Sequence, residues 1–331
     1  MKLTIIGAAG MIGRKLAEHV ATHSQLNGRT VTAMTLVDVV VPEVAHDFVG
    51  TREAYAADLT QDGAATRLVA DRPDVIVHLA AIVCGEAEAD MAKGYRVNLD
   101  GTRALLEAIA AQENYCPRVI YASSLAVFGA PFPARIPDDF NLTPLTSYGT
   151  QKAMGEMLVN DYSRRGFIDG VGIRFPTICI RPGKPNKAAS GFFSGILREP
   201  LNGQEAILPV EDDVRHWFAS PRAAVGYIVH AATLDTHALG ANRCMTMPGV
   251  TATVGEQIEE ALRAIAGDAA VALIRRVPDP AVASIVAGWP QDFDTARAIE
   301  LGFTAEKTFQ EIIQVYLEDE MGQPALTGAA S

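Results

Sequence analysis

A glycine-rich loop near the start of the chain, Gly7-Ala-Ala-Gly-Met-Ile-Gly13, constrains the fold more than any other feature. It follows a short apolar run at 3–6 that is typical of a buried strand, and it precedes a helical pattern at 11–26. In such a unit the small residues let the backbone approach a pyrophosphate, and the free N–H groups of the helix N-terminus bind its charge. We predict a dinucleotide site here rather than an ordinary glycine turn. The expected contacts are Gly7, Gly10, Met11, Ile12 and Gly13.

Short β-branched runs alternate with helical patterns through the first half of the chain, as they do in βαβ units with a parallel sheet. From Pro176 onward, proline and glycine become frequent, which indicates loops and short helices instead of another regular unit. The prediction is an α/β fold, a Rossmann-type doubly wound parallel sheet with a smaller, interleaved C-terminal lobe. Strands are expected at 3–6, 31–37, 75–79, 119–122 and 171–174, and helices at 11–26, 61–71, 87–112 and 147–165.

The chain is expected to form two parts. A dinucleotide-binding domain would span 1–175 and include a return segment near 218–247, and a substrate-binding lobe would consist of 176–217 and 248–331. The expected site is the cleft between them, because ligands of open α/β sheets bind outside the carboxyl ends of the strands. The later elements are a helix at 225–232, a strand at 243–247, and amphipathic helices at 254–266 and 305–318.

The composition excludes several classes of partner. The net charge of −11 argues against nucleic acid and against an anionic membrane. The longest apolar stretch, at 75–84, is interrupted by His78 and is too short to span a bilayer. We expect the first residues to lead directly into a strand and not to form a secretion signal. The four cysteines and seven histidines show no paired or ligand spacing, so we expect reduced thiols, a cytoplasmic protein and no metal site.

Asp38 ends the second expected strand, where a carboxylate accepts hydrogen bonds from both hydroxyls of the adenosine ribose. The 2′-phosphate of NADP would meet a like charge there, which costs about 4 kcal/mol for a pair of charges ~4 Å apart near a protein surface. The following residues, 39–41, are valines and offer no compensating cation. We therefore predict that the cofactor is NAD.

Other cofactor contacts are expected where the next strands end. Asp58 is placed to accept a hydrogen bond from the exocyclic amine of adenine, although an exposed loop aspartate would look the same. The alanines after the strand at 75–79 leave room for the cofactor, and Asn98 is expected to be a structural hydrogen-bonding residue close to the site. The full set is Asp58, Leu59, Ala80, Ala81 and Asn98.

Three polar residues in the middle of the chain indicate acid/base chemistry at a hydroxyl group. Tyr148 and Lys152 are one turn apart on the expected helix at 147–165, and Ser124 lies just beyond the strand at 119–122. A phenol has a pKa near 10, so a phenolate base at neutral pH needs a shift worth about 4 kcal/mol, which a nearby ammonium supplies. Tyr148 would take the substrate proton while hydride leaves the same carbon, and Ser124 would orient the reacting oxygen. The alternative is a chance spacing on a helix surface.

A cationic stretch at 174–198 contains five basic residues and no carboxylate. The simplest interpretation is a solvated basic face. Beside an active site in an acidic protein, however, such a stretch favours an anionic substrate. The basic residues are Arg174, Arg181, Lys184, Lys187 and Arg198.

Together these motifs resemble the extended short-chain dehydrogenase/reductase superfamily over nearly the whole chain. The resemblance implies that Ser124, Tyr148 and Lys152 are the catalytic residues. It also implies that Pro176 and Thr177 present backbone groups to the carboxamide of the nicotinamide. The segments that carry the likeness are 7–13, 78–81, 123–129, 148–152 and 174–177.

Some segments are more similar to one branch, the D-erythronate dehydrogenases, which oxidise the C2 hydroxyl of a four-carbon sugar acid with NAD. This likeness implies conversion of D-erythronate to 2-dehydro-D-erythronate. Such a substrate needs a cation for its carboxylate and polar partners for its alcohols. The segments are 130–133, 143–152, 176–193 and 213–217, and the candidate substrate residues are Ser124, Arg181, Lys184, Asn186, Lys187, Ser190 and Arg215. Phe128 and Ile6 depart from the superfamily pattern, but neither removes a catalytic group.

Two other functions remain open on the same residues. A nucleoside-diphosphate-sugar epimerase or dehydratase would keep NAD tightly bound and recycle the hydride, with Phe192 and Phe193 available to stack a nucleobase. A non-catalytic nucleotide-sensing protein is disfavoured by the intact catalytic residues. Proteins of the superfamily dimerise through the helices that correspond to 87–112 and 147–165, so we expect a homodimer.

Overall fold

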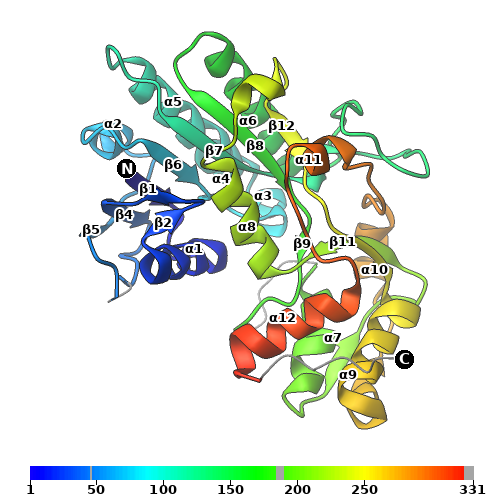
Figure 1. Cartoon of the computed structure of the whole chain (residues 1–331). Helices are drawn as coiled ribbons and strands as arrows, with labels where there is room; N and C mark the ends of the chain where they lie inside the picture. Colours follow the sequence, from blue (N-terminus) through cyan, green and yellow to red (C-terminus); the bar gives the residue numbers. More distant parts are fainter. Residues whose placement is uncertain (45–46, 184–189, 324–331) are drawn as a thin grey trace.

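The computed structural model describes residues 1–44, 47–183 and 190–323, and a seven-stranded parallel sheet forms its centre (Figure 1). The strand order is β12-β8-β7-β6-β1-β4-β5, so the chain starts inside the sheet, moves out to one edge, and then builds the other half. This is the predicted Rossmann-type doubly wound fold. The strands are β1 (Lys2–Ile6), β4 (Ala33–Asp38), β5 (Thr51–Ala56), β6 (Val75–His78), β7 (Arg118–Ser124), β8 (Asp169–Phe175) and β12 (Cys244–Thr246).

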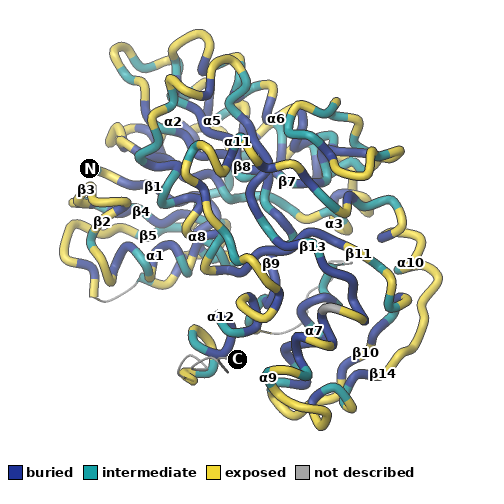
Figure 2. The backbone as a smooth tube through the Cα atoms, turned by 45° about the vertical axis from the view of Figure 1, so that its right-hand side comes forward, coloured by how far each residue is buried: buried dark blue, intermediate teal, exposed yellow. Residues whose placement is uncertain are grey.

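Helices cover both faces of the sheet, which explains why its inner strands are continuous apolar runs. These helices are α1 (Met11–His23), α2 (Ala64–Val69), α5 (Gly101–Ala110), α6 (Ser147–Arg164) and α8 (Pro221–Ala231). The pair α1 and α8 covers one face, and α2, α5 and α6 cover the other (Figure 1). Each layer has its own core, which includes Leu16 and Ile228 in the first and Leu105 and Val159 in the second. Figure 2 shows the inner strands buried between the two layers, whereas the edge strand β5 has no buried residue.

A smaller lobe is built on separate sheets from the later part of the chain. Its three-stranded sheet consists of β9 (Thr177–Ile178), β11 (Arg215–Ala219) and β13 (Val250–Thr253), and β10 (Ala206–Leu208) pairs with β14 (Ile274–Arg276). Its helices are α7 (Gly191–Leu201), η4 (Val254–Glu259), α9 (Glu260–Val271), α10 (Pro280–Ala287) and α12 (Phe309–Met321). The core of this lobe is distinct from those of the large sheet and includes Phe193, Phe218 and Ile312. The domain boundaries given above stay a prediction.

The helix predicted at 11–26 ends at His23, because the chain turns into a hairpin. Asn27 and Gly28 take positive φ angles of 44° and 81°, the conformation in which an Asn-Gly pair closes two-residue hairpins. The hairpin joins β2 (Gln25–Leu26) to β3 (Arg29–Thr30). The prediction of a longer helix was wrong here.

The helix predicted at 87–112 is divided into successive segments. Asp90 leaves the helical conformation, with φ −137° and ψ 84°, and its carboxylate accepts a hydrogen bond from the Lys93 N–H at 2.9 Å, which caps the following turn. The segments are α3 (Cys84–Ala89), α4 (Met91–Gly94), the π-helical η1 (Tyr95–Asp100) and α5. The other short elements are η2 (Leu125–Val127), η3 (Thr236–Leu239) and α11 (Ala296–Glu300).

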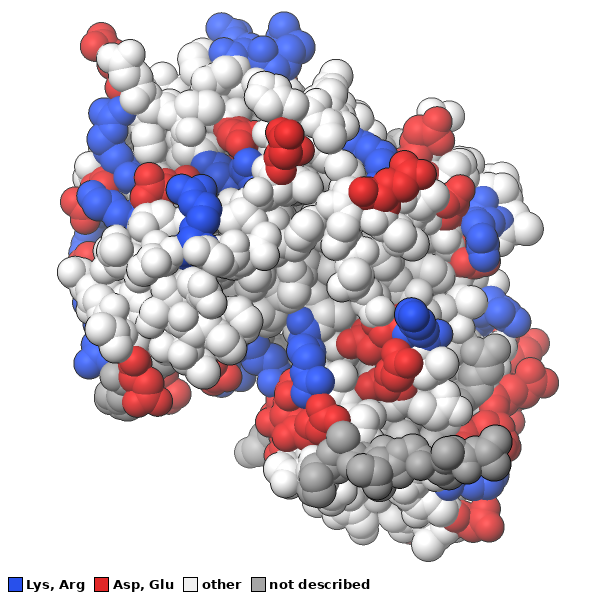
Figure 3. All heavy atoms as spheres, viewed as in Figure 1, with Lys and Arg blue, Asp and Glu red and all other residues white. Residues whose placement is uncertain are grey.

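Within the described ranges, no helix has the length and apolar character that a bilayer crossing requires. On the face in Figure 3, basic and acidic side chains are interspersed, so the acidic excess of the chain is not gathered into one patch of that face.

Candidate active site

The glycine loop lies between the end of β1 and the start of α1, and its backbone leaves no room for side chains at two positions. A Cβ atom at Gly7, where φ is +89°, would lie 2.6 Å from the Ala80 nitrogen. A Cβ atom at Gly13 would lie 2.4 Å from the Gly7 carbonyl oxygen. Gly10 is less constrained, with its nearest contact at 3.3 Å. The loop therefore needs glycine at Gly7 and Gly13 so that the N-terminus of α1, with Met11 and Ile12 in its first turn, can approach the end of the sheet.

Asp38, the last residue of β4, is attached to this loop. Its carboxylate accepts hydrogen bonds from the Ala9 N–H at 2.9 Å and from the Val39 N–H at 2.7 Å, one on each oxygen. Each carboxylate oxygen has a second lone pair, so Asp38 retains acceptor capacity for a ribose. Val39, Val40 and Val41 are exposed beside it.

The other residues expected around the adenine lie near the carboxyl ends of the neighbouring strands. Asp58 accepts a hydrogen bond from the Thr60 N–H at 2.9 Å and closes a local turn. Leu59 packs against Gly101 of α5, and the Ala80 N–H donates to the Ile6 carbonyl at 3.1 Å. Contact of Asp58, Leu59, Ala80 and Ala81 with a cofactor stays a prediction.

Asn98, in η1, holds the loop that follows β6. Its side-chain oxygen accepts from the Ile82 N–H at 2.9 Å. Its amide nitrogen donates to the Ile82 carbonyl at 3.1 Å and to Gln151 Oε1 at 2.8 Å. Both amide hydrogens are used in these bonds, so Asn98 ties this loop to α6 and has only a lone pair left for any ligand.

Three residues of α6, each one turn from the next, contact the end of β7: Tyr148, Lys152 and Glu156. Ser124 forms a hydrogen bond with the Tyr148 side chain. The Ala122 carbonyl accepts from Lys152 Nζ at 2.8 Å, and the Ser123 hydroxyl donates to Glu156. Lys152 Nζ also lies 5.8 Å from the centroid of the Tyr148 ring. The structure thus brings Ser124, Tyr148 and Lys152 together, on a helix whose N-cap, Thr146, accepts from the Gly149 N–H at 3.0 Å.

The electrostatics of the pair differ from the sequence-based expectation. Burial raises the pKa of Tyr148 to about 12, and the hydrogen bond with Ser124 opposes that rise. Burial lowers the pKa of Lys152 to about 8, and the negative charge of Glu156 opposes that fall. The sequence predicts that the ammonium lowers the pKa of the phenol, but the cost of burying a phenolate is the larger effect. The groups of the chain alone therefore keep Tyr148 neutral at pH 7 and Lys152 mostly charged.

Thr177, in β9, is oriented by a histidine that the sequence did not single out. His216 of β11 accepts from the Thr177 hydroxyl through Nε2 at 2.6 Å and contacts the Pro290 carbonyl through Nδ1 at 3.0 Å. A carbonyl only accepts, so Nδ1 carries the hydrogen. Burial lowers the pKa of His216 to about 4, which keeps the ring neutral. Because the hydrogen of the Thr177 hydroxyl is used here, that hydroxyl can only accept hydrogen bonds. Contact of the Pro176 and Thr177 backbone with a nicotinamide stays a prediction.

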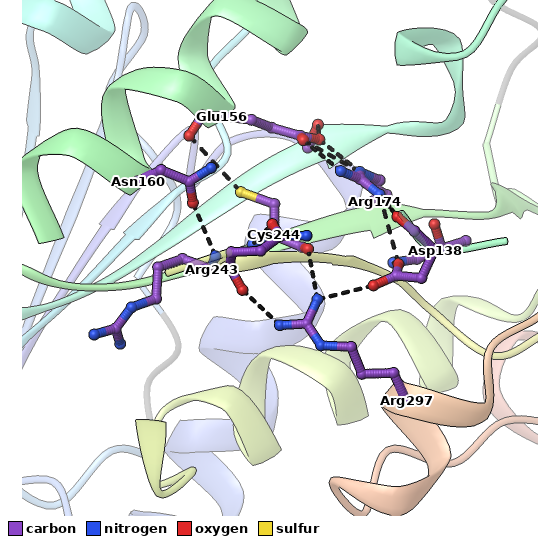
Figure 4. Close-up of polar contacts among 10 residues, drawn as sticks. Asp138, Glu156, Asn160, Arg174, Arg243, Cys244 and Arg297 are labelled. Atoms are coloured by element: carbon purple, nitrogen blue, oxygen red, sulfur yellow. Dashed lines mark hydrogen bonds and ion pairs between the residues drawn. The ribbon is translucent and has the colours of Figure 1, made fainter. Parts of the chain in front are cut away.

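Two of the five basic residues in 174–198 do not form the expected open cationic stretch. Arg174 is buried and binds both oxygens of Glu156, at 2.9 and 2.8 Å (Figure 4). Arg198 forms an ion pair with Glu199 and donates to the Arg181 carbonyl at 2.8 Å. The prediction that Arg174 and Arg198 belong to an anion-receiving surface was wrong, because their charges are already matched inside the protein.

Arg181 is different, because its guanidinium has no carboxylate partner in the part of the chain that the structure describes. It donates to the Ser190 hydroxyl at 2.8 Å, and burial lowers its pKa. Arg215 is exposed at the start of β11. Three further candidates, Lys184, Asn186 and Lys187, lie outside the described residues.

Cys84 is another residue beside the site that sequence reasoning did not single out. Its thiol forms a hydrogen bond with Thr146, and it acts electrostatically on Tyr148. A single cysteine at the start of a helix carries no sequence signal for this position. Glu156, in contrast, could have been found from the sequence. It follows Lys152 by four residues, as Lys152 follows Tyr148, and this spacing predicts that all three lie on one face of the helix.

Comparisons with known proteins identify the family of this chain. Residues 3–233 match the model of the NAD dependent epimerase/dehydratase family. The chain is 42% identical over 323 residues to D-erythronate dehydrogenase of Cupriavidus necator, covering 96% of this chain and 98% of that protein. It is 40% identical over 321 residues to D-erythronate dehydrogenase of Haemophilus influenzae, covering 97% of this chain and all of that protein.

Solved structures include a protein described as the nucleoside-diphosphate-sugar epimerase from Agrobacterium tumefaciens, with a TM-score of 0.96 and 59% identity over 98% of this chain and 96% of that one. An L-threonine dehydrogenase from Cupriavidus necator shares the fold, with a TM-score of 0.81 and 23% identity over 96% of this chain and 99% of that one. The predicted resemblance and the expectation of an oxidoreductase acting on CH–OH groups are confirmed. The chain belongs to the NAD-dependent epimerase/dehydratase family of extended short-chain dehydrogenases/reductases.

Proposed function

We propose that this protein oxidises the C2 hydroxyl of a small sugar acid, D-erythronate, to the 2-keto acid with NAD. The observation that carries the proposal is the seating of Ser124, Tyr148 and Lys152 at the end of β7, the sheet edge that also holds the glycine loop. The two relatives named D-erythronate dehydrogenase, each about 40% identical over nearly the full length, support the choice of substrate.

The residues of the chain fit the cofactor that this reaction needs. The glycine loop and Asp38 would hold the pyrophosphate and the adenosine ribose, and Pro176 and Thr177 the nicotinamide end. NAD, when bound, accepts the hydride, and the positive charge of its ring favours a phenolate nearby. Loss of a hydride from C2 and of a proton from its hydroxyl accounts for both hydrogens of the alcohol.

Each catalytic side chain has one task in this scheme. Tyr148 takes the hydroxyl proton of the substrate, and Ser124 holds the reacting oxygen against the phenol. Lys152 places a positive charge behind the ring and opposes the cost of a buried phenolate. Because burial raises the pKa of Tyr148 to about 12, we expect oxidation to become faster as the pH rises toward the pKa of Lys152, about 8.

Arg181 is the preferred partner for the substrate carboxylate. Its guanidinium is free of carboxylates among the described residues and is partly buried, so an incoming carboxylate would replace lost solvation. Arg215 is the second candidate. Lys184, Asn186, Lys187 and Ser190 are proposed to complete the substrate site.

The proposal is tested by following NADH formation with D-erythronate, with other C4 to C6 sugar acids, and with UDP-sugars. We expect net NADH from D-erythronate and no change in the UDP-sugars. The structure named as a nucleoside-diphosphate-sugar epimerase favours the alternative, a nucleotide-sugar epimerase or dehydratase. Conversion of a UDP-sugar without net NADH would establish that alternative and reject the proposal.

The preference for NAD over NADP is proposed to depend on Asp38. Replacement by asparagine removes the like charge facing a 2′-phosphate, so the ratio of kcat/KM for NAD to that for NADP should fall by roughly tenfold, less than a full charge pair would give because Asp38 is partly solvated. Steady-state kinetics with both cofactors measure the ratio. Equal efficiency of NAD and NADP in the wild-type protein would contradict this assignment.

The homodimer and the cytoplasmic location remain predictions. Exposed apolar side chains on α4 and α6, those of Met91, Met154 and Met157, are surface that an interface through these helices would cover.

A further inference from the structure

Glu156 is a buried carboxylate one turn beyond Lys152, on the same face of α6. Its exposure is 1% and that of Lys152 is 2%, so both charged groups are removed from water. They are also seated on neighbouring residues of one strand, because Lys152 donates to Ala122 and Glu156 accepts from Ser123. Along α6, Glu156 thus follows Lys152 by one turn, as Lys152 follows Tyr148.

A series of ion pairs with alternating charges begins at Glu156 (Figure 4). Arg174 of β8 binds both of its carboxylate oxygens, and the Arg174 guanidinium also donates to the Asp138 carbonyl at 2.9 Å. Asp138 in turn forms an ion pair with Arg297 of α11 at 2.8 Å. This bidentate pairing fixes the position of the Glu156 carboxylate between Arg174 and Ser123.

We propose that Glu156 is a positioning residue which, held by Ser123 and Arg174, keeps the Lys152 ammonium charged and seated behind Tyr148. This role rests on the proposed dehydrogenase function. Burial alone favours the neutral amine, which would leave a phenolate at Tyr148 without its supporting charge. The negative charge of Glu156 opposes this, and Arg174 and Asp138 follow Glu156 with alternating sign.

The other titratable and charged groups around Lys152 do not account for a change of its charge near neutral pH. Burial, with the charge of Lys152, lowers the pKa of His78 to about 3, and burial raises the pKa values of Tyr121, Cys244 and Cys84. These groups are therefore neutral near pH 7, and Arg174 stays charged throughout. The groups around Lys152, by element, are His78 of β6, Tyr121 of β7, Arg174 of β8, Cys244 of β12, Cys84 of α3 and Tyr148 of α6.

The test is the variant Glu156→Gln, studied by a pH titration of Lys152 itself. The chain has seven lysines, so side-chain ¹³C labelling of lysine gives a simple NMR spectrum, in which the signal missing from Lys152→Met is assigned to Lys152. Loss of the negative charge destabilises the ammonium, so the midpoint should fall by about one pH unit or more. The alkaline limb of kcat/KM should move to lower pH by the same amount.

The matched control is Asp169→Asn, which breaks the ion pair with Arg118 at the opposite ends of the same two strands. It should leave the Lys152 titration unchanged. Asp138→Asn removes the next negative charge in the series of ion pairs, beyond Arg174. It should therefore lower the midpoint of the Lys152 titration by less than Glu156→Gln does. If Glu156→Gln does not fold, Asp138→Asn takes its place in the test.

The inference is overturned if the midpoint of the Lys152 titration is unchanged in folded Glu156→Gln. The same holds for Asp138→Asn where that variant is used instead. A shifted midpoint in a protein that oxidises no sugar acid supports the inference and rejects the proposed function, so the two failures are distinguishable.

Discussion

Replacement of Tyr148 by phenylalanine is expected to lower kcat for sugar-acid oxidation by about 10²- to 10⁴-fold. The variant lacks the hydroxyl that would accept the substrate proton, whereas the ring, the helix and the glycine loop are unchanged. NAD affinity should remain within about threefold of wild type, since the phenol contributes to the chemical step more than to cofactor binding. Steady-state NADH formation measures the first quantity, and calorimetric titration with NAD measures the second.

Tyr121→Phe is the matched control, because it removes a second buried tyrosine hydroxyl next to the same ammonium. The Tyr121 ring centroid lies 5.0 Å from Lys152 Nζ, and its hydroxyl has no hydrogen-bond partner among the described residues. Loss of an unpaired buried hydroxyl should be neutral or stabilising, with little change in kcat. Appreciable turnover by Tyr148→Phe, or an equal loss in both variants, would contradict the assignment of Tyr148 as the base.

The elements that form the site were predictable because their signals are local. The spacing of Tyr148 and Lys152 needs only a helix, and Thr146 marks its start. The glycine loop needs a strand before it and a helix after it. Asn27-Gly28 is an equally local hairpin signal, and the turn it forms explains why the helix predicted over 11–26 ends at His23.

The electrostatics of the site were not predictable, because burial is a property of the whole fold. The sequence places Arg174 among other cations, yet β8 directs it onto Glu156, which is 18 residues earlier in the chain. The same burial raises the pKa of Tyr148, where a count of nearby charges suggested the reverse. His216 could not be found either, because its contact with Thr177 depends on the pairing of β9 with β11.

The largest effect expected on cofactor binding is that of Gly13→Ala. The added methyl group would lie 2.4 Å from the Gly7 carbonyl oxygen and 2.7 Å from Ala8 Cα. Both are backbone atoms, so no flexible side chain can move aside, and the N-terminus of α1 must shift away from the loop. A displacement of this order can cost about 10²-fold, so we expect NAD affinity to fall by about that factor in calorimetric titration.

Gly226→Ala separates this effect from a general cost of replacing a helical glycine. Gly226 lies in α8, which packs against α1, and a Cβ atom there would have no atom within 4 Å. Alanine should stabilise this helix by about 0.5–1 kcal/mol and leave NAD affinity unchanged. The contact made by a methyl group at Gly13 cannot be relieved without moving the backbone N–H groups that are proposed to bind the pyrophosphate. If Gly13→Ala bound NAD as tightly as Gly226→Ala does, the backbone of the glycine loop would therefore not be the pyrophosphate site.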